Sequence, residues 1–335
     1  MSDPIRFGII GTGAIAQVAH LPLLSKRRDV EIVALCDTDL PKARALANRF
    51  GVGNVYDDIV DMFRDAKPEA VVVCTPNHLH EVHASAALSA GVHVLCERPV
   101  AMTSAGVEKL VAVEKKSDRI LMAGMNHRFR SDVQAVREFL RGEELGEVRS
   151  IRCGWYTYQP SHVLGWRIYG PQAGGGAMQD LGLPLIDLAL WLTDYPKPIA
   201  VSAHLGTTKT NGDVEQDGCA FIRCEDGPSI FVDVSWNHVG DREMLWLDMV
   251  GSHGSAGIGP LRVFKEISGK PVNVTPTGAT GRENAFTVSY RGELAHFIAA
   301  VRGEVEPVGL DDQIELHRLV EAIQRSAAEG CEVTL

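Results

Sequence analysis

The sequence lacks any apolar run long enough to cross a bilayer, and it lacks an excess of positive charge. No apolar stretch approaches the roughly 18 residues that a membrane span requires. Met1–Arg6 leads directly into an apolar segment, without the basic region and cleavage site of a secretory leader. Lys and Arg total 33 against 43 Asp and Glu, a formal charge of −10, which repels phosphate backbones and anionic membranes. We expect a cytoplasmic protein with no nucleic-acid or membrane partner.

Cysteine is also sparse, and its arrangement excludes the usual zinc and redox motifs. The seven cysteines include no CxxC pair, and Cys219 and Cys224 have no histidine cluster at ligand spacing. Cys36, Cys74 and Cys96 lie in or beside apolar, strand-like runs, where a free thiol behaves as a small hydrophobe. We expect reduced, structural cysteines and no metal site.

Internal repeats, low-complexity tracts and a Pro/Gly-rich linker are absent as well. With 45% hydrophobic and 23% charged residues, the composition is that of an ordinary globular protein. A chain of 335 residues is too long for one average domain, so its length predicts two domains, each with its own core.

The first third of the chain alternates short apolar runs with amphipathic stretches, which is typical of a parallel sheet with helices on both faces. The predicted strands are Ile5–Ile10, Glu31–Cys36, Ala70–Cys74, His93–Cys96 and Ile120–Gly124, and the predicted helices include Asp39–Phe50 and Val82–Ala90. Residues 1–124 are therefore predicted to form a doubly wound domain.

After Asn126 the pattern changes to longer alternating strands with few helices between them, which predicts a largely antiparallel sheet. The expected strands are Glu147–Tyr158, Ala200–Gly206, Gly218–Cys224, Ser229–Trp236 and Leu245–Val250, and the expected helices are Asp132–Arg141, Gln179–Leu192, Gly292–Arg302 and Gln313–Ala328. The predicted fold class is α/β: a Rossmann domain followed by an α+β domain of residues 125–335. In an alternative arrangement, the last helix of the second domain packs back on the first domain.

A glycine motif follows the first predicted strand. Gly11, Gly13 and Ala16 form G-x-G-x-x-A between that strand and a helical pattern, the context that dinucleotide binding requires. Gly11 allows the tight turn, Gly13 lets a pyrophosphate approach the backbone, and Ala16 keeps helix and strand close. Backbone N–H groups at the helix start, at Ala14 and Ile15, can then hold the phosphates.

An acidic residue ends the second strand at the position expected for a ribose ligand. Asp37 follows the glycines by the usual interval, and its carboxylate can accept both ribose hydroxyls while repelling a 2′-phosphate. No Arg or Lys stands at the adjacent positions, so NAD is predicted over NADP. The alternative is a turn-initiating Asp without a ligand.

Three further segments carry a family resemblance: Thr75-Pro76-Asn77 with His80, Cys96-Glu97-Arg98-Pro99, and Gly174-Gly175-Gly176 followed by Asp180, Gly182 and Asp187. With the glycine motif, they resemble the Gfo/Idh/MocA oxidoreductases, the family of glucose-fructose oxidoreductase and inositol dehydrogenase. The likeness extends to the carboxy-terminal Glu321-Ala322-Ile323 and Ser326-Ala327.

The resemblance implies a carbohydrate-like substrate held between the two domains against the nicotinamide, and a homodimer or homotetramer built on the open sheet. It also assigns further residues to the cofactor: Thr75, Pro76, Asn77 and His80 to the dinucleotide cleft, Glu97 and Asn126 to the nicotinamide ribose, and Trp166 and Arg167 to an approach from the second domain. The fold alone does not justify those roles.

Two positions depart from the family pattern. The family usually has Lys where this chain has Arg98 and His where it has Pro184. Lys and His exchange protons near neutral pH, whereas Arg, with a pKa above about 12, does not and Pro has no proton to give. Pro184 is still tolerated in the first turn of a helix.

Substitute acid–base groups are therefore needed if the chemistry is retained. His162, in the segment leading to the glycine triplet, is the first choice because its ring titrates near pH 7. Asp180 is the second candidate, against the alternative of a helix N-cap. Tyr156, Tyr158 and Tyr169 are weaker candidates. Arg98 suits a substrate carboxylate, or else it contacts only the cofactor.

Three functions remain open from the sequence. The first is NAD-dependent transfer of hydride to or from a secondary hydroxyl or ketone of a sugar, polyol, sugar acid or cyclic diol. The second is a lyase or glycosidase-type enzyme that retains NAD and makes no net redox change. The third is a catalytically degenerate ligand-binding protein, which the loss of both Lys and His would produce.

Overall fold

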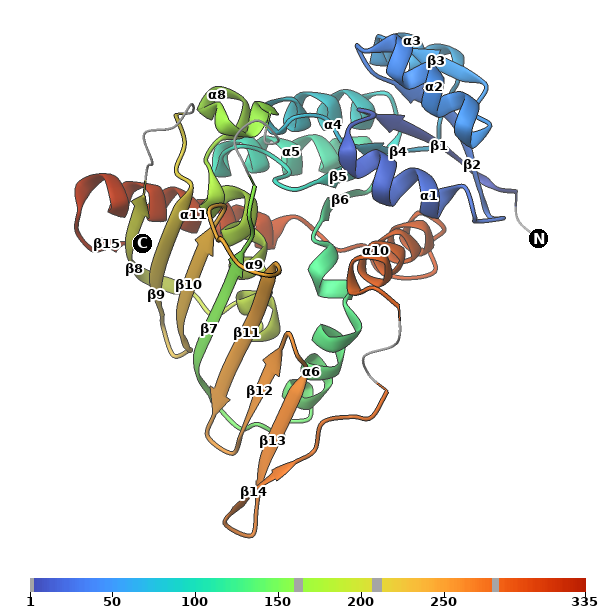
Figure 1. Cartoon of the computed structure of the whole chain (residues 1–335). Helices are drawn as coiled ribbons and strands as arrows, with labels where there is room; N and C mark the ends of the chain where they lie inside the picture. Colours follow the sequence, from blue (N-terminus) through green and yellow to red (C-terminus); the bar gives the residue numbers. More distant parts are fainter. Residues whose placement is uncertain (1–2, 160–164, 207–212, 279–282) are drawn as a thin grey trace. The chain divides into compact units, whose positions relative to one another are not determined.

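The computed structural model describes residues 3–159, 165–206, 213–278 and 283–335 (Figure 1), and it divides into two compact units. The first comprises Met1–Asn126 together with Tyr290–Ile314, and the second comprises His127–Ser289 together with Glu315–Leu335. His162 lies outside the described residues.

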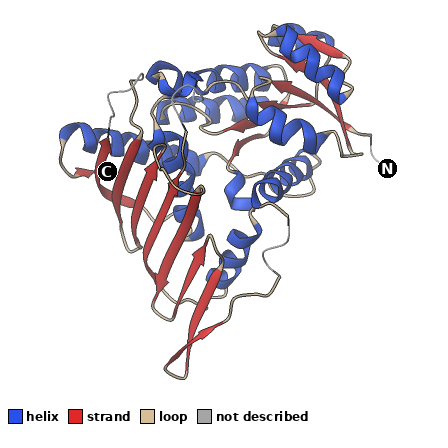
Figure 2. Cartoon of the chain, viewed as in Figure 1, coloured by secondary structure: helices blue, strands red, loops and turns tan. Residues whose placement is uncertain are grey.

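The first unit is built on a six-stranded sheet in the order β3-β2-β1-β4-β5-β6, with every pair of neighbours parallel. Its strands are β1 (Ile5–Ile10), β2 (Val30–Cys36), β3 (Asn54–Tyr56), β4 (Ala70–Val73), β5 (His93–Glu97) and β6 (Leu121–Gly124). The apolar runs are buried on both faces because helices cover both, as Figure 2 shows. The predicted Rossmann sheet is confirmed.

The helices of this unit follow the strands at the expected places. They are η1 (Ala16–His20), α1 (Leu21–Leu24), α2 (Leu40–Phe50), α3 (Ile59–Asp65), η2 (Asn77–Leu79), α4 (His80–Ser89), α5 (Ser104–Ser117) and η3 (Asn126–Phe129). The stretch η1 has the wider π-helical turn, a feature frequent at functional sites.

A helix from late in the chain completes the first unit. Tyr290 and the residues that follow it in α10 (Ala285–Val301) pack on the first strand and helix: Phe297 meets Phe7 edge to face at 6.1 Å, and Tyr290 meets His20 at 5.4 Å. The side chain of Arg302 also donates to the Asp29 carbonyl at 3.2 Å. Long-range packing therefore brings α10 to the glycine loop.

The second unit is built on a nine-stranded sheet in the order β14-β13-β12-β11-β7-β10-β9-β8-β15. All its neighbouring strands are antiparallel except β7 and β10, which run parallel. The strands are β7 (Val148–Tyr156), β8 (Pro198–Gly206), β9 (Asp217–Cys224), β10 (Ser229–Ser235), β11 (Met244–Gly251), β12 (Gly254–Ile258), β13 (Arg262–Ile267), β14 (Lys270–Asn273) and β15 (Val333–Thr334). The predicted open, largely antiparallel sheet is confirmed.

Helices cover one face of this sheet, and the other face carries exposed apolar residues such as Phe221 and Phe231. The helices are α6 (Ser131–Arg141), η4 (Gly165–Ile168), α8 (Gly170–Ala173), η5 (Met178–Gly182), α9 (Leu183–Leu192) and α11 (Asp311–Glu329). A buried ion pair between Arg128 and Asp187, joined by the Tyr195 hydroxyl, ties α9 to the segment before α6. Asp187, which belongs to the segment that follows the glycine triplet, is therefore held in a buried ion pair within the second unit.

Candidate functional site

The glycine loop turns against the end of β4. Gly11 has φ +90°, and a Cβ on it would lie 2.8 Å from the carbonyl of Cys74 and from Thr75 N. Because that neighbour is backbone, no other residue fits without moving the strand. At Gly13 the nearest protein atom to an added Cβ is 4.0 Å away. The protein's own packing therefore does not require glycine at position 13, which leaves close approach by a ligand as its use.

The carboxylate of Asp37 is fixed at this loop. Its Oδ2 accepts from the backbone N–H and the hydroxyl of Thr12, both at 2.7 Å, and its Oδ1 accepts from Asp39 N at 2.9 Å. Burial alone would raise the pKa of Asp37, but these hydrogen bonds, with one from Lys42, lower it below the ordinary value. Asp37 is therefore an oriented, ionised acceptor, and its bond from Asp39 N, two residues on, is also the Asx turn of the alternative interpretation.

A lysine that the sequence reasoning missed stands beside this carboxylate. Lys42 Nζ lies 3.2 Å from Asp37 Oδ2, because α2 begins after its N-cap Asp39 and turns Lys42 back toward the strand end. The prediction of NAD over NADP rested on the positions adjacent to Asp37, where no Arg or Lys stands. The helix start, with Asp39 and Pro41, is the signal that would have placed Lys42 there.

The segments after β4 and β5 are tied together by one buried histidine. His80 is 1% exposed, and its Nδ1 and Nε2 each lie 2.7 Å from a backbone carbonyl, that of Pro99 and that of Thr75. Burial lowers the pKa of His80, while the two carbonyls act against that shift. His80 therefore tethers the Thr75-Pro76-Asn77 and Glu97-Arg98-Pro99 segments through their backbones.

Glu97 ends β5 and forms a buried pair with the helix that follows the glycine loop. Its Oε1 lies 2.7 Å from Nε2 of His20, which is completely buried. The ring of Tyr290 packs edge to face on His20, and Glu293 lies one turn further along α10. The sequence reasoning placed Glu97 near the cofactor but missed the residues of α10, because nothing local links residues 290–293 to residue 20.

Asp180 lies in a π-helical turn of the second unit. Its Oδ2 accepts the indole N–H of Trp236 at 3.2 Å. The residue that caps α9 is Gly182, so Asp180 does not act as the N-cap of that helix. Trp236 directly follows β10 and is 1% exposed, so a rigid core side chain orients the half-buried carboxylate.

The glycine triplet before this turn packs against the chain that enters β9. A Cβ on Gly176 would lie 1.8 Å from the carbonyl oxygen of Glu215, and Ala177 N donates to that same oxygen. The Glu215 side chain accepts from Met178 N, and burial raises its pKa despite hydrogen bonds that act against the shift. The triplet is therefore needed for close backbone packing just ahead of Asp180.

Pro184 is fully buried at the start of α9, in the first turn as expected. The π-helical turn η5 directly precedes it, and the chain remains helical through both. The scaffold accommodates proline here, and this side chain holds no transferable proton.

The remaining candidates lie elsewhere in the second unit. Arg167 packs its guanidinium over the Trp166 ring at 4.9 Å in η4, directly after the undescribed segment that holds His162. The Tyr156 hydroxyl donates to Asp233 at 2.6 Å, and burial, with that contact, raises its pKa. Tyr158 and Tyr169 are more than half exposed.

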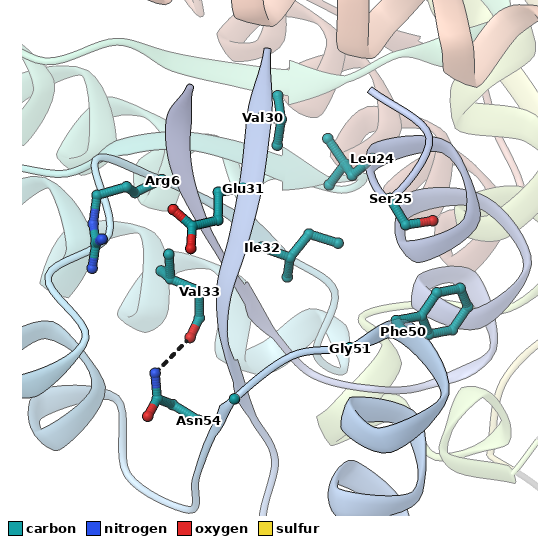
Figure 3. Close-up of a pocket in the computed structure, with 11 residues that line it drawn as sticks. Arg6, Leu24, Ser25, Val30, Glu31, Ile32, Val33, Phe50, Gly51 and Asn54 are labelled. Atoms are coloured by element: carbon teal, nitrogen blue, oxygen red, sulfur yellow. Dashed lines mark hydrogen bonds between the residues drawn. The ribbon is translucent and has the colours of Figure 1, made fainter. Parts of the chain in front are cut away.

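A cavity of about 350 Å³ lies in the first unit but holds none of the predicted site residues. Figure 3 shows Arg6, Glu31 and Asn54 among the side chains that line it, with Asn54 donating to the Val33 carbonyl. Its strand residues are Arg6 of β1, residues 30–33 of β2 and Asn54 of β3, and none of them lies at the carboxyl end of β2 that leads to Asp37. This cavity is therefore separate from the glycine loop.

The described residues contain neither a candidate membrane span nor a candidate metal cluster. No helix among them is both long and apolar enough to span a bilayer. Nor does that part of the chain contain a group of three His, Cys, Asp or Glu side chains arranged to hold a metal. Cys36, Cys74 and Cys96 are buried free thiols, as the sequence predicted.

Comparison with family models identifies the class of protein. Residues 5–125 match the GFO/IDH/MocA oxidoreductase family, NAD-binding Rossmann fold, and residues 133–257 match the GFO/IDH/MocA C-terminal domain. The chain belongs to the Gfo/Idh/MocA oxidoreductase family.

Individual relatives match over the whole chain. D-glucoside 3-dehydrogenase of Escherichia coli (strain K12) is 30% identical over 100% of this chain and 98% of its own length. The structure of GenD2 from gentamicin A biosynthesis, in complex with NAD, superposes with a TM-score of 0.86 at 26% identity, over 100% of this chain and 97% of that one. Aldose-aldose oxidoreductase from Caulobacter crescentus, complexed with glycerol, gives 0.86 at 26% identity over 99% and 100%.

Proposed function

We propose that the protein is an NAD-dependent oxidoreductase that moves hydride between a secondary hydroxyl of a sugar or sugar-like ring and C4 of the nicotinamide. The observation that carries the proposal is the Asp37 carboxylate, held by Thr12 at the glycine loop of a sheet with Rossmann strand order. In such sheets the dinucleotide lies across the carboxyl edge where the strand order reverses, here between β1 and β4.

The residues present fit this cofactor. Gly11 makes the tight turn, Gly13 leaves the approach to the backbone open, and Ala14 and Ile15 begin the helix whose N–H groups suit phosphates. Asp37 supplies the acceptor for the ribose hydroxyls. When bound, NAD supplies a two-electron acceptor, and the other steps fall to the protein's own side chains.

NAD rather than NADP is the proposed cofactor, on the balance of charges around Asp37. The carboxylate repels a 2′-phosphate, and Lys42, the cation beside it, is already paired with that carboxylate. Thr75, Pro76, Asn77, Glu97, Arg98 and Asn126, with Trp166 and Arg167 of the second unit, are proposed to complete the site. For His80 we propose an indirect role, because its ring holds two loops together by their carbonyls.

The substrate class follows from the relatives. D-glucoside 3-dehydrogenase matches this chain end to end, and aldose-aldose oxidoreductase shares its fold at 26% identity. We therefore propose a D-glucoside or related pyranoside, oxidised at a ring hydroxyl. Domain limits of 1–124 and 125–335 and a homo-oligomeric state belong to the same proposal.

Asp180 is the proposed acid–base residue among the described side chains. With Arg98 and Pro184 standing where the family pattern has Lys and His, it is a carboxylate that Trp236 holds in one orientation. His162 remains the alternative proton acceptor. For Arg98, a grip on a substrate carboxylate is the proposed use, and unchanged affinity for sugar acids in Arg98→Lys would refute it.

A substrate screen tests the proposal. The purified protein is incubated with NAD and a panel of D-glucosides, sugar acids and cyclic diols, while absorbance at 340 nm and product formation are followed. Net NADH with a keto product supports the proposal. Product without net NADH indicates instead an NAD-retaining lyase or glycosidase, and ligand stabilisation without any product indicates a binding protein.

A further inference from the structure

A buried carboxyl lies one turn along α10 from Tyr290 and has no hydrogen-bond partner among the described residues. Glu293 of α10 is 0% exposed, and neither of its side-chain oxygens finds a donor there. An ionised carboxylate in such a place carries a large desolvation cost, which the group avoids by keeping a proton. Burial, and next the negative charge of Glu97, raises the pKa of Glu293 well above its ordinary value, while Arg98 acts in the opposite direction.

Four titratable groups among the described residues interact electrostatically with Glu293. Glu97 and Arg98 lie at the end of β5, Cys74 follows β4, and Tyr290 lies one turn earlier on α10. Burial, followed by negative neighbours, raises the pKa of both the Cys74 thiol and the Tyr290 phenol, so both stay neutral. The charged groups are therefore Arg98 and Glu97.

Glu97 and Glu293 differ in their hydrogen-bond partners, and this difference decides which of the two carboxyls keeps a proton. Glu97 has His20 at 2.7 Å as a partner for its carboxylate, whereas Glu293 has no such partner among the described side chains. Two carboxyls close enough to influence one another do not both ionise readily. The proton therefore belongs on Glu293.

This cluster borders the glycine loop. An added Cβ on Gly11 would touch the backbone carbonyl of Cys74, the residue that follows β4. His20 ends the π-helical stretch that begins three residues after Gly13. A charge that arrives at the carboxyl edge of β1, β4 and β5 therefore arrives near Glu97, and the His20 that pairs with Glu97 packs against α10 one turn before Glu293.

We propose that Glu293 holds a proton in the cofactor-free protein, releases it when oxidised NAD binds, and keeps it when NADH binds. The inference rests on the proposed function, because it requires the nicotinamide to bind at this edge. The oxidised ring carries a positive charge that favours an ionised neighbour, and the reduced ring does not. Glu293 thus senses the redox state of the cofactor through charge alone.

The proton balance of the reaction gives this exchange a use. Oxidation of a secondary alcohol sends the carbinol hydrogen with two electrons to the ring as hydride, and the hydroxyl proton to a base. Once the ring is neutral, the Glu293 carboxylate regains its affinity for a proton and can take the hydroxyl proton over from that base, so the protein ends the step holding one more proton. Arg98 cannot make that exchange, since its guanidinium stays charged. Glu293 is a positioning residue here, because nothing places it against the reacting atoms.

Binding calorimetry tests the proposal without turnover. NAD and NADH are titrated into the nucleotide-free protein at pH 7, each in phosphate and in Tris, whose different ionisation heats count the protons released. We expect release approaching one proton for NAD and none for NADH. Below the point where Glu293 ionises in the free protein, NAD affinity should rise about tenfold per pH unit, while NADH affinity stays flat.

Matched variants assign the proton. Glu293→Gln keeps the shape of the protonated side chain and should bind both nucleotides with no proton release. Glu114→Gln is the control: the pKa of Glu114 is also raised, chiefly by burial, but its side chain accepts from Leu121 N at the opposite, amino-terminal end of the sheet. That variant should release the proton as the wild type does.

The results distinguish failure of the inference about Glu293 from failure of the proposed function. Equal proton counts for NAD and NADH in the wild type, or release that persists in Glu293→Gln, would overturn the inference while NAD binding still supports the proposed function. No binding of either nucleotide would overturn both. Should Glu293→Gln fold poorly, difference infrared spectra of the wild type decide, since NAD must remove a protonated-carboxyl band that NADH leaves in place.

Discussion

Asp37 shows how the fold holds a single carboxylate in one orientation without any bound ligand. Two donors from Thr12 and one from Asp39 hold it in place, and together with Lys42 they keep it ionised although it is partly buried. Because the folded pKa is lowered, the carboxylate loses its charge only when the pH falls below the ordinary Asp range, near 4. Its acceptor function is therefore constant across physiological pH.

Removing this carboxylate should weaken NAD binding more than NADP binding. Asp37→Ala loses charge-assisted hydrogen bonds worth about 1.5–3 kcal/mol, so the NAD dissociation constant should rise roughly 10- to 100-fold. Lys42→Ala is the control at the neighbouring charge, and it should leave NAD affinity nearly unchanged while further weakening NADP. Fluorescence titration with both nucleotides measures each effect. Wild-type NAD affinity in Asp37→Ala would refute the assignment.

Variants of Asp180 and Trp236 should distinguish loss of the proposed acid–base group from loss of its orientation. Asp180→Asn removes the proposed acid–base group and should lower kcat roughly 100- to 10,000-fold without changing NAD affinity. Trp236→Phe replaces the indole with a smaller aromatic ring and deletes the N–H that donates to Asp180, so a loss of only about tenfold is expected. Steady-state kinetics across pH test both, since only Asp180→Asn should abolish a limb of the profile. An unchanged profile in Asp180→Asn would move the role to His162.

At the scale of elements, local patterns predicted the strands well and failed where contacts are distant. β1 was predicted to the residue, because a mostly apolar run between Pro4 and Gly11 has one interpretation in a parallel sheet. β3, with only three partly exposed residues, has no such pattern and was missed. β12, β13 and β14 were missed too, being short or exposed at the sheet edge.

The site was predictable only where its residues are close in sequence or follow a motif. The glycine loop and Asp37 are a known spacing with a physical reason. By contrast, Asp180 and Trp236 lie 56 residues apart, and His20 and Glu97 lie 77 apart. No periodicity records such pairings, which depend on how strands order themselves in the sheets. The contribution of α10 to the first unit belongs to the same class of feature.

The glycine triplet should prove intolerant of a side chain at its third position. In Gly176→Ala the Cβ would meet the Glu215 carbonyl oxygen at 1.8 Å, and the backbone must shift at a cost of about 1–3 kcal/mol. Gly206→Ala, in β8 of the same unit, places its Cβ in ordinary contact at 3.7 Å from Asp217 and should be nearly neutral. Thermal unfolding compares the two. Equal melting temperatures would show that the triplet is not packed as described.

For the whole molecule, the dependence of stability on pH has two opposed sources. Burial lowers the pKa of His80, His83 and His93, so the unfolded chain binds more protons below about pH 6.5 and stability falls with acidification. Burial raises the pKa of Glu114 and Glu293, which acts in the opposite direction, because the folded state then binds more protons above the ordinary Glu range. The net profile is flatter than either set alone.

A substitution of His93 isolates the contribution of one buried histidine to the pH dependence of stability. His93→Gln removes one titrating ring but keeps an acceptor for Ile120 N. The stability of the wild type relative to His93→Gln should therefore decline as the pH falls from about 7.5 to 5.5, since only the wild type must bury a neutral ring that water would protonate. Calorimetric unfolding at both pH values measures the difference. A relative stability that rises on acidification would contradict the assigned direction.

The account as a whole depends on net hydride transfer from a sugar carbon to NAD. The most direct test uses a methyl D-glucoside deuterated at C3, incubated with the full-length protein and excess NAD, with the free nucleotide analysed by mass spectrometry and NMR. We predict deuterated NADH at one equivalent per keto sugar formed, with deuterium at C4 of the nicotinamide. A converted sugar with no deuterium in the free nucleotide, or no conversion of any pyranoside while NAD is bound, would contradict the account.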